Sequence, residues 1–215
     1  MEKNITPSES TSLITEFKRK FSLREMYGAA IFAPRAMKKL IGNNKSQLVD
    51  KRFVERLQLA VTEVNGCALC SYGHTKMALR QGMSSEEIKS FLSGGDTFIK
   101  PEEAKAILFA QHFADSRGYP KKYAYDAIVK EYGEEKARII LSAIQMITIG
   151  NMYGIPISAF HSRLKGKPYK GSTIFYELKM QILGLLILPI AMVHGLIRGI
   201  IGLPNERFDK NTADE

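Results

Sequence analysis

The sequence predicts an all-α protein, because helix signals follow one another along the chain with no strand signal between them. Apolar residues recur at helical spacing, most clearly over residues 47–64, and glycine or proline marks the end of most such stretches. No alternation of apolar and polar residues bounded by hairpin turns occurs, so no strand is expected. A length of 215 residues with 45% hydrophobic content suits one globular domain with an appendage.

The expected helices begin and end at residues that commonly bound helices. Asn65-Gly66 stops the helix over 47–64, since glycine readily adopts the left-handed geometry of a helix C-terminus. Ser84 is a favourable N-cap, and Pro101 followed by two acids is typical of a first turn. In chain order, the expected helices cover 11–45 with breaks near Pro34 and at 42–44, then 47–64, 67–82, 84–94, 100–118, 120–132 and 134–150.

The chain is basic, with 31 Lys and Arg against 22 Asp and Glu and a formal charge of +9. The positive residues gather in FKRKFSLR at 17–24 and in SRLKGKPYKG at 162–171. Neither segment lies beside a helix-turn-helix, zinc-finger or RNA-recognition signature, so no nucleic-acid partner is expected. The N-terminus is polar with no apolar stretch behind it, which predicts no secretory signal and a reducing cytoplasm as the setting for the two cysteines.

The two cysteines stand three residues apart in NGCALCSYGHTKMAL, and His74 follows the second by four. Cys67 is expected in the first turn of its helix, with Cys70 one turn on and His74 one further turn, so the three side chains share a face. Backbone N–H groups at a helix start favour the thiolate, which is the nucleophilic form of cysteine. A histidine on the same face is suited to relay a proton near neutral pH.

The pair has three other interpretations. A structural zinc site would need a second ligand pair, and the sequence has no second CxxC, while its other histidines are scattered singly. A c-type haem needs a histidine directly after the second cysteine, where this chain has Ser71. Two buried cysteines that act as small apolar core residues remain an open alternative.

These residues carry a family resemblance. The segment RFVERLQLAVTEVNGCALCSYGHTKMALRQGMSSEEI resembles the core of the alkylhydroperoxidase D-like (AhpD-like) proteins of the carboxymuconolactone decarboxylase superfamily. The match consists of Glu55, then Cys67 twelve residues later, then Cys70 and His74, and similar context extends over residues 45–165. Some peroxidase members have a histidine between the two cysteines, and this chain departs from them with Ala68-Leu69.

The resemblance implies an AhpD-like helical fold that assembles into a homo-oligomer, a trimer or a hexamer, and a peroxiredoxin-like thiol peroxidase or disulfide oxidoreductase activity. Carried over, Cys70 attacks the hydroperoxide or disulfide substrate, Cys67 resolves the sulfenate as a disulfide, and Glu55 and His74 relay protons. The implied redox group is the dithiol itself, with no bound cofactor and no metal, and the implied reductant is a lipoyl or thioredoxin-like thiol protein. Members without cysteines decarboxylate a lactone, and the presence of both cysteines argues against that branch.

The glutamate is the less certain member of this set. Glu63 lies closer to Cys67 in sequence than Glu55 does, and it is an alternative proton relay. Tyr72 and Asn151 could line a pocket, but a packed tyrosine and a helix-end asparagine are the simpler interpretations, so neither is included in the expected site.

The C-terminal stretch is apolar on every side. Residues 180–197, MQILGLLILPIAMVHGLI, carry no charge, and their number, 18, lies near the lower limit for a membrane span, which is about 17 residues. The basic residues before the stretch would hold that side in the cytoplasm. Pro189 and His194 favour instead a buried helix in an oligomer core, so a span, a helix on the membrane surface and an assembly helix all remain open.

The sequence thus predicts three regions and one leading function. The regions are an N-terminal helical extension (1–45), an AhpD-like domain (46–168), and an apolar C-terminal segment with a polar tail (169–215). The leading function is a cytoplasmic dithiol oxidoreductase, with residues 180–203 expected to attach it to the cytoplasmic face of a membrane. The alternative is a catalytically silent, membrane-associated oligomeric scaffold or redox sensor.

Overall fold

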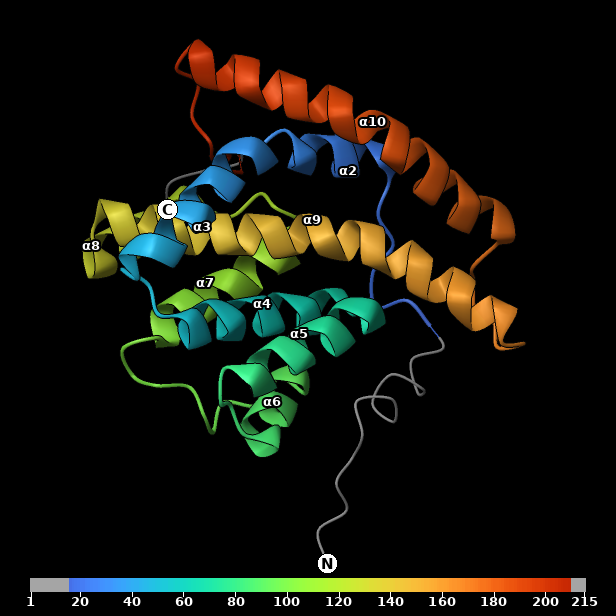
Figure 1. The fold of residues 1–215 in the computed structure, drawn as a ribbon, viewed down its shortest axis with the longest axis horizontal. Coiled ribbons are helices and arrows are strands. Elements are labelled where there is room, and N and C mark those ends of the chain that lie inside the picture. The colour runs from blue at the N-terminus through green and yellow to red at the C-terminus, as the bar shows by residue number, and fades with distance from the viewer. Residues whose placement is uncertain (1–15, 210–215) are drawn as a thin grey trace, which may run out of the picture.

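The computed structural model describes residues 16–209, and this part of the chain is helical, which confirms the all-α class (Figure 1). The one β-type contact within these residues is an isolated bridge between Glu16 and Lys170. The helices are α2 (Leu23–Ala30), α3 (Ala33–Ser46), α4 (Lys51–Asn65), α5 (Ala68–Arg80), α6 (Ser85–Leu92), α7 (Ala104–Asp115), α8 (Lys122–Tyr132), α9 (Glu134–Leu164) and α10 (Ile174–Ile200).

Helix α9 is the axis of the fold. It is 31 residues long and runs through the middle of the molecule, with α4 to α7 on one side and α2, α3 and α10 on the other (Figure 1). Apolar residues on nearly every side of α9 are buried, because it packs against α3, α4, α5, α8 and α10. A helix that is apolar all round is stable in water only when other elements surround it in this way.

Two apolar clusters fill the spaces on the two sides of α9. The larger lies among α4, α6, α7, α8 and α9 and includes Leu57, Ile107 and Ile140. The smaller lies among α2, α9 and α10 and includes Met26, Met152 and Cys67. Cys70 packs against both clusters, so the cysteine pair lies where the two halves of the core meet.

Several helix bounds differ from the expected ones. Helix α9 was expected to end near residue 150, but it continues through Pro156 to Leu164. Pro156 is buried together with Gly154, Ile155 and Ala159, so packing outweighs the intrinsic cost of a proline inside a helix, which is about 3 kcal/mol. Helix α7 begins at Ala104 rather than near residue 100, because residues 101–103 form turns.

The N-terminal helices also differ in detail. The break expected near Pro34 lies just before it, and Pro34 occupies the first turn of α3, where it needs no N–H. The break expected at 42–44 is wrong, because α3 continues to Ser46. Asn43 is buried there, and its side chain exchanges two hydrogen bonds with the backbone of Val49. Of the helix expected from residue 11 onward, residues 11–15 lie outside the described residues, and the expectation is wrong for residues 16–22, which are not helical.

Helix α10 lies along the outside of the molecule, with one face on the body. That face consists of Glu177, Met180, Gly184, Ala191 and Gly195, which are buried against α2, α3 and α9. A Cβ on Gly195 would collide with the carbonyl oxygen of Ile31, so the missing side chain permits the close approach of α10.

Residues 203–209, named here the C-terminal strap, follow α10 and return to the body. The side chain of Gln145 on α9 donates to the Asn205 carbonyl at 2.6 Å. The Arg207 guanidinium donates to the carbonyls of Gly118 at 3.0 Å and Gly28 at 2.9 Å, and it stacks on the Tyr119 ring. Both ends of α10 are therefore held by the same globular body.

Candidate active site

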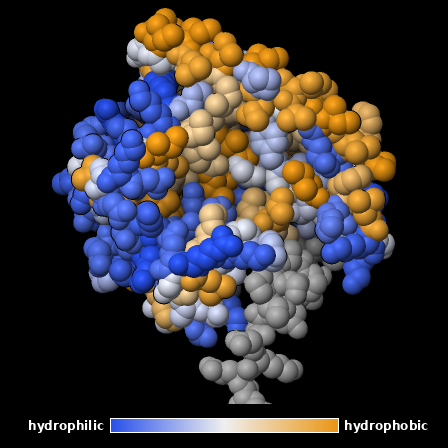
Figure 2. All heavy atoms as spheres, in the orientation of Figure 1, coloured by the Kyte–Doolittle hydropathy of each residue, from blue (hydrophilic) through white to orange (hydrophobic). Residues whose placement is uncertain are grey.

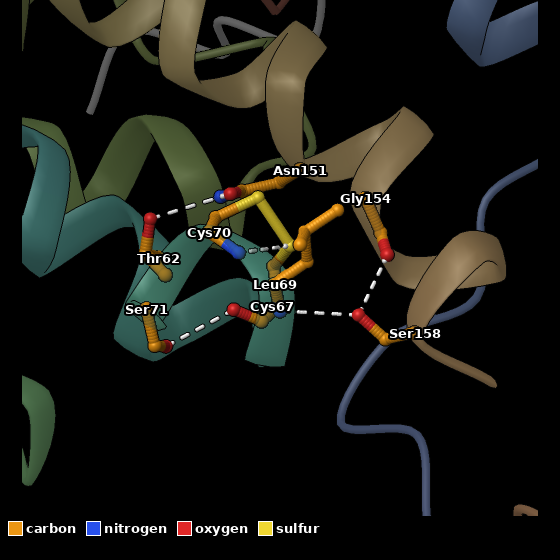
Figure 3. Close-up of a disulfide and its surroundings, with 8 residues drawn as sticks. All are labelled: Thr62, Cys67, Leu69, Cys70, Ser71, Asn151, Gly154 and Ser158. Carbon is orange, nitrogen blue, oxygen red and sulfur yellow. Dashed lines mark hydrogen bonds between the residues drawn. A yellow bond between two sulfur atoms is a disulfide. The ribbon is translucent and has the colours of Figure 1, made fainter. Parts of the chain in front are cut away.

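The cysteine pair occupies the junction between α4 and α5. Helix α4 ends at Gly66, whose φ of 71° is the left-handed conformation that glycine adopts without strain. Cys67 is then the N-cap of α5, just before the first turn in which it was expected, and Cys70 is the third helical residue. The two form a disulfide with their Cα atoms 5.3 Å apart, as their spacing and the resemblance led us to expect (Figure 3).

The two sulfur atoms have different environments. Cys67 is fully buried, and its Sγ accepts a hydrogen bond from the backbone N–H of Cys70 at 3.2 Å. A sulfur in the N-cap position that accepts such a bond is stabilised as a thiolate. Cys70 is only partly buried, so it is the more exposed of the two cysteines.

Glu55 and His74 lie together beside the pair. Glu55 comes from α4 and is 4% exposed, and its Oε2 lies 2.9 Å from Nδ1 of His74, which stands one turn after Cys70 on α5. When neutral His74 donates its Nδ1–H to this carboxylate, its Nε2 is left as an acceptor. Gln81, at the end of α5, donates from Nε2 to the other oxygen of Glu55 at 3.5 Å.

The structure also places the alternative glutamate. Glu63 contacts Lys18, with Nζ and Oε1 2.6 Å apart, and not His74. Of the two acids considered from the sequence, Glu55 is therefore the one that is in position to orient the histidine.

An ion-pair network fixes the helix that carries Glu55. Arg56, which is 3% exposed, donates from Nε to Glu87 on α6 at 2.7 Å and from Nη1 to Glu103 at 3.0 Å. Burial raises the pKa of Glu103 although Arg56 and Lys100 favour its charged form. Removing one partner of such a buried pair leaves the other charge uncompensated, so the network holds α4 in place.

Helix α9 forms a wall directly over the disulfide, and sequence reasoning missed this. A Cβ on Gly154 would lie 2.6 Å from Sγ of Cys67 and 2.8 Å from Sγ of Cys70, so only glycine fits here (Figure 3). Ser158, one turn later, accepts from the backbone N–H of Leu69 at 3.1 Å, which satisfies a free N–H at the start of α5. The only signal in the sequence is a glycine two residues before a proline in a helical stretch.

Buried polar side chains complete the wall. Asn151, which was left out of the expected site, is fully buried on α9 next to Cys70, and its Oδ1 accepts from the Thr62 hydroxyl at 3.3 Å (Figure 3). Its Nδ2 has no hydrogen-bond partner among the described residues. Tyr72, the other residue left out, lies under the ammonium of Lys76 at 4.3 Å from the ring centre.

No group of three or more His, Cys, Asp and Glu side chains within residues 16–209 is arranged to hold a metal ion. The chemistry that the arrangement offers is that of the dithiol, a proton acceptor on His74 and a carboxylate that orients it. The distances join the expected residues in two pairs, Cys67 with Cys70 and Glu55 with His74.

Comparison with known proteins identifies the same region. Residues 33–112 match the model of the carboxymuconolactone decarboxylase family. A protein of Bacillus subtilis (strain 168) described as "Uncharacterized protein YdfG" is 26% identical over 129 residues, which are 57% of this chain and 87% of the Bacillus protein. No solved structure matches the chain significantly. The matched region contains Glu55, both cysteines and His74, so this part of the chain is similar to the carboxymuconolactone decarboxylase family.

Proposed function

We propose that this protein is an AhpD-like dithiol oxidoreductase that reduces a hydroperoxide or a disulfide while Cys67 and Cys70 cycle between dithiol and disulfide. The observation that carries the proposal is the disulfide itself, which joins a buried and an accessible cysteine at a helix start. In a reducing cytoplasm such a pair is more often catalytic than structural.

The exposure of the two sulfurs supports the roles that the resemblance implies. The accessible Cys70 thiolate attacks the terminal O–O oxygen of a hydroperoxide, and the alcohol leaves as Cys70 becomes a sulfenic acid. The buried Cys67 thiolate then attacks Cys70 Sγ and displaces water, which forms the disulfide. One hydroperoxide and two thiols give one alcohol, one water and one disulfide, and a lipoyl or thioredoxin-like thiol protein restores the dithiol.

His74 and Glu55 supply the proton transfers in this proposal. Nε2 of His74 takes the thiol proton of Cys70, one helical turn away, and returns it to the leaving alkoxide. The Glu55 carboxylate holds the imidazole orientation and stabilises the imidazolium that forms in between.

The test uses the wild-type full chain, two variants of it and a hydroperoxide in small excess. Wild-type protein should lose both free thiols and gain an intrachain disulfide by mass. Cys67→Ser should stop at a sulfenic acid on Cys70 after one turnover, and Cys70→Ser should not react. Sulfenate trapped on Cys67 in the Cys70→Ser variant would reverse the assigned roles.

The alternative, a silent scaffold or redox sensor, makes a different prediction in the same experiment. A scaffold need not have a reversible pair, so both thiols would survive oxidant that fully oxidises a control thiol peroxidase. A sensor would form the disulfide once but show no turnover with any thiol reductant. Steady consumption of hydroperoxide with a dithiol reductant excludes both.

A further inference from the structure

The outer face of α10 is a long apolar surface that the fold leaves uncovered within residues 16–209. The helix has 27 residues and is about 40 Å long, and only 22% of its most apolar window is buried. Figure 2 shows apolar side chains gathered over α10 along one edge of the molecule, while much of the visible remainder is polar. Its exposed stripe, named here the α10 outer face, contains Phe175, Ile182, Leu186, Val193, Ile197 and Ile200.

Contacts at the two ends of α10 determine how it can meet a bilayer. At its start, Glu177 is fully buried and accepts two hydrogen bonds from the Arg163 guanidinium, at 2.7 and 2.8 Å. After its end, the C-terminal strap is bonded to Gln145 and Gly28 in the body. A helix that crossed the membrane would separate the strap from the body and break these bonds, so α10 in this fold lies along a surface and does not span.

The exposed charges carried by residues 164–203 have one sign. Between residues 164 and 203 the exposed charged side chains are Lys165, Lys167, Lys170 and Lys179. The single acid in this range, Glu177, is buried and paired with Arg163.

We propose that the α10 outer face lies in the plane of an anionic phospholipid bilayer, with its apolar side chains in the acyl boundary and the lysines at the headgroups. An in-plane helix buries its apolar face about 5–10 Å into that boundary. The lysines complement anionic lipid, whereas the like charges of two copies packed face to face along α10 would repel each other. This surface stands apart from the dithiol chemistry and does not depend on it.

The test is flotation of the full chain with sealed vesicles of phosphatidylcholine alone or mixed with phosphatidylserine. Wild-type protein should float with the anionic vesicles, bind the neutral ones more weakly, and be released in part by salt. The double variant Leu186→Gln and Val193→Gln should bind at least roughly tenfold more weakly, because each substitution removes an apolar side chain that the bilayer buries on binding. Lys167→Gln and Lys179→Gln should each weaken binding to anionic vesicles about fivefold.

Matched controls separate the surface from general effects. Leu108 on α7 is 63% exposed, close to Leu186 at 59%, and Leu108→Gln should leave flotation unchanged. Lys89→Gln on α6 is the charge control and should also change nothing.

Two results would overturn the proposal. One is a wild-type oligomer that ignores both vesicle types and that Leu186→Gln and Val193→Gln convert to monomers, which would make the face a protein interface. The other is protection of residues 203–209 from protease outside the vesicles while the body stays accessible, which would make α10 a span.

Discussion

Gly154 offers a direct test of the wall over the disulfide. Changing Gly154 to alanine adds a Cβ within 2.8 Å of both sulfurs, which no flexible side-chain end can relieve. The helix gains about 1 kcal/mol from the better propensity of alanine, and overpacking costs about 1–3 kcal/mol. Gly150→Ala is the matched control, because Gly150 lies one turn earlier on α9, is exposed, and has nothing within 4 Å of its added Cβ.

Both variants carry the same propensity gain, so the difference between them isolates the overpacking. In the oxidised protein, we expect Gly154→Ala to melt below Gly150→Ala by about 4–8 °C, which corresponds to about 2 kcal/mol in a chain of this size. In the dithiol form the Cys70 side chain is free to rotate away from the added methyl group. The alanine therefore destabilises the disulfide form more than the dithiol form. The reduction potential of the pair should therefore rise by about 30 mV. Equal melting points and equal reduction potentials for the two variants would refute the claim that α9 leaves no room for a side chain at Gly154.

The remaining predictions concern the proton relay and the attachment of α10. His74→Ala should slow peroxide reduction by roughly 100-fold, and Glu55→Gln should slow it by a smaller factor. Glu63→Gln should match wild type in steady-state turnover. A loss of turnover in Glu63→Gln as large as that in His74→Ala would assign the proton relay to Glu63 instead. Hydrogen bonds from Arg163 and Ser172 lower the pKa of Glu177 despite its burial, so its contribution to stability is present above its ordinary pKa of 4.5 and is lost as the pH falls through the lowered value. Glu177→Gln should cost about 1–3 kcal/mol at neutral pH and flatten the acid limb of the urea-unfolding free energy, and an unchanged acid limb would contradict this account.

The sequence was sufficient for the parts of the fold and site that depend on local signals. Helix periodicity and the Gly66 stop predicted the α4–α5 junction, and the spacing of the two cysteines predicted their disulfide. The shared face of Cys67, Cys70 and His74 stays a prediction. The contact between Glu55 and His74 follows from the family resemblance and not from spacing, because the two residues are on different helices.

What the sequence could not provide depends on elements that meet from far apart. The expected end of α9 was wrong because a proline in water ends a helix, while Pro156 is buried among neighbours that the local sequence does not name. Gly154 and Ser158 act on Leu69 and the cysteines across more than 80 positions, so no local pattern marks them. The three regions proposed from sequence, with their boundaries at 45 and 168, stay a prediction.

The C-terminal strap has a consequence for how the chain reaches its native state. The bond between Arg207 and Gly28 joins positions 179 apart, and contacts of such long separation repay their loop-closure entropy late in folding. Before the strap docks, α10 exposes its inner face as well as its outer one, and such a partly folded chain is prone to aggregate. Arg207→Ala should accordingly lower the yield of refolding at high protein concentration more than it lowers the activity of the molecules that do fold.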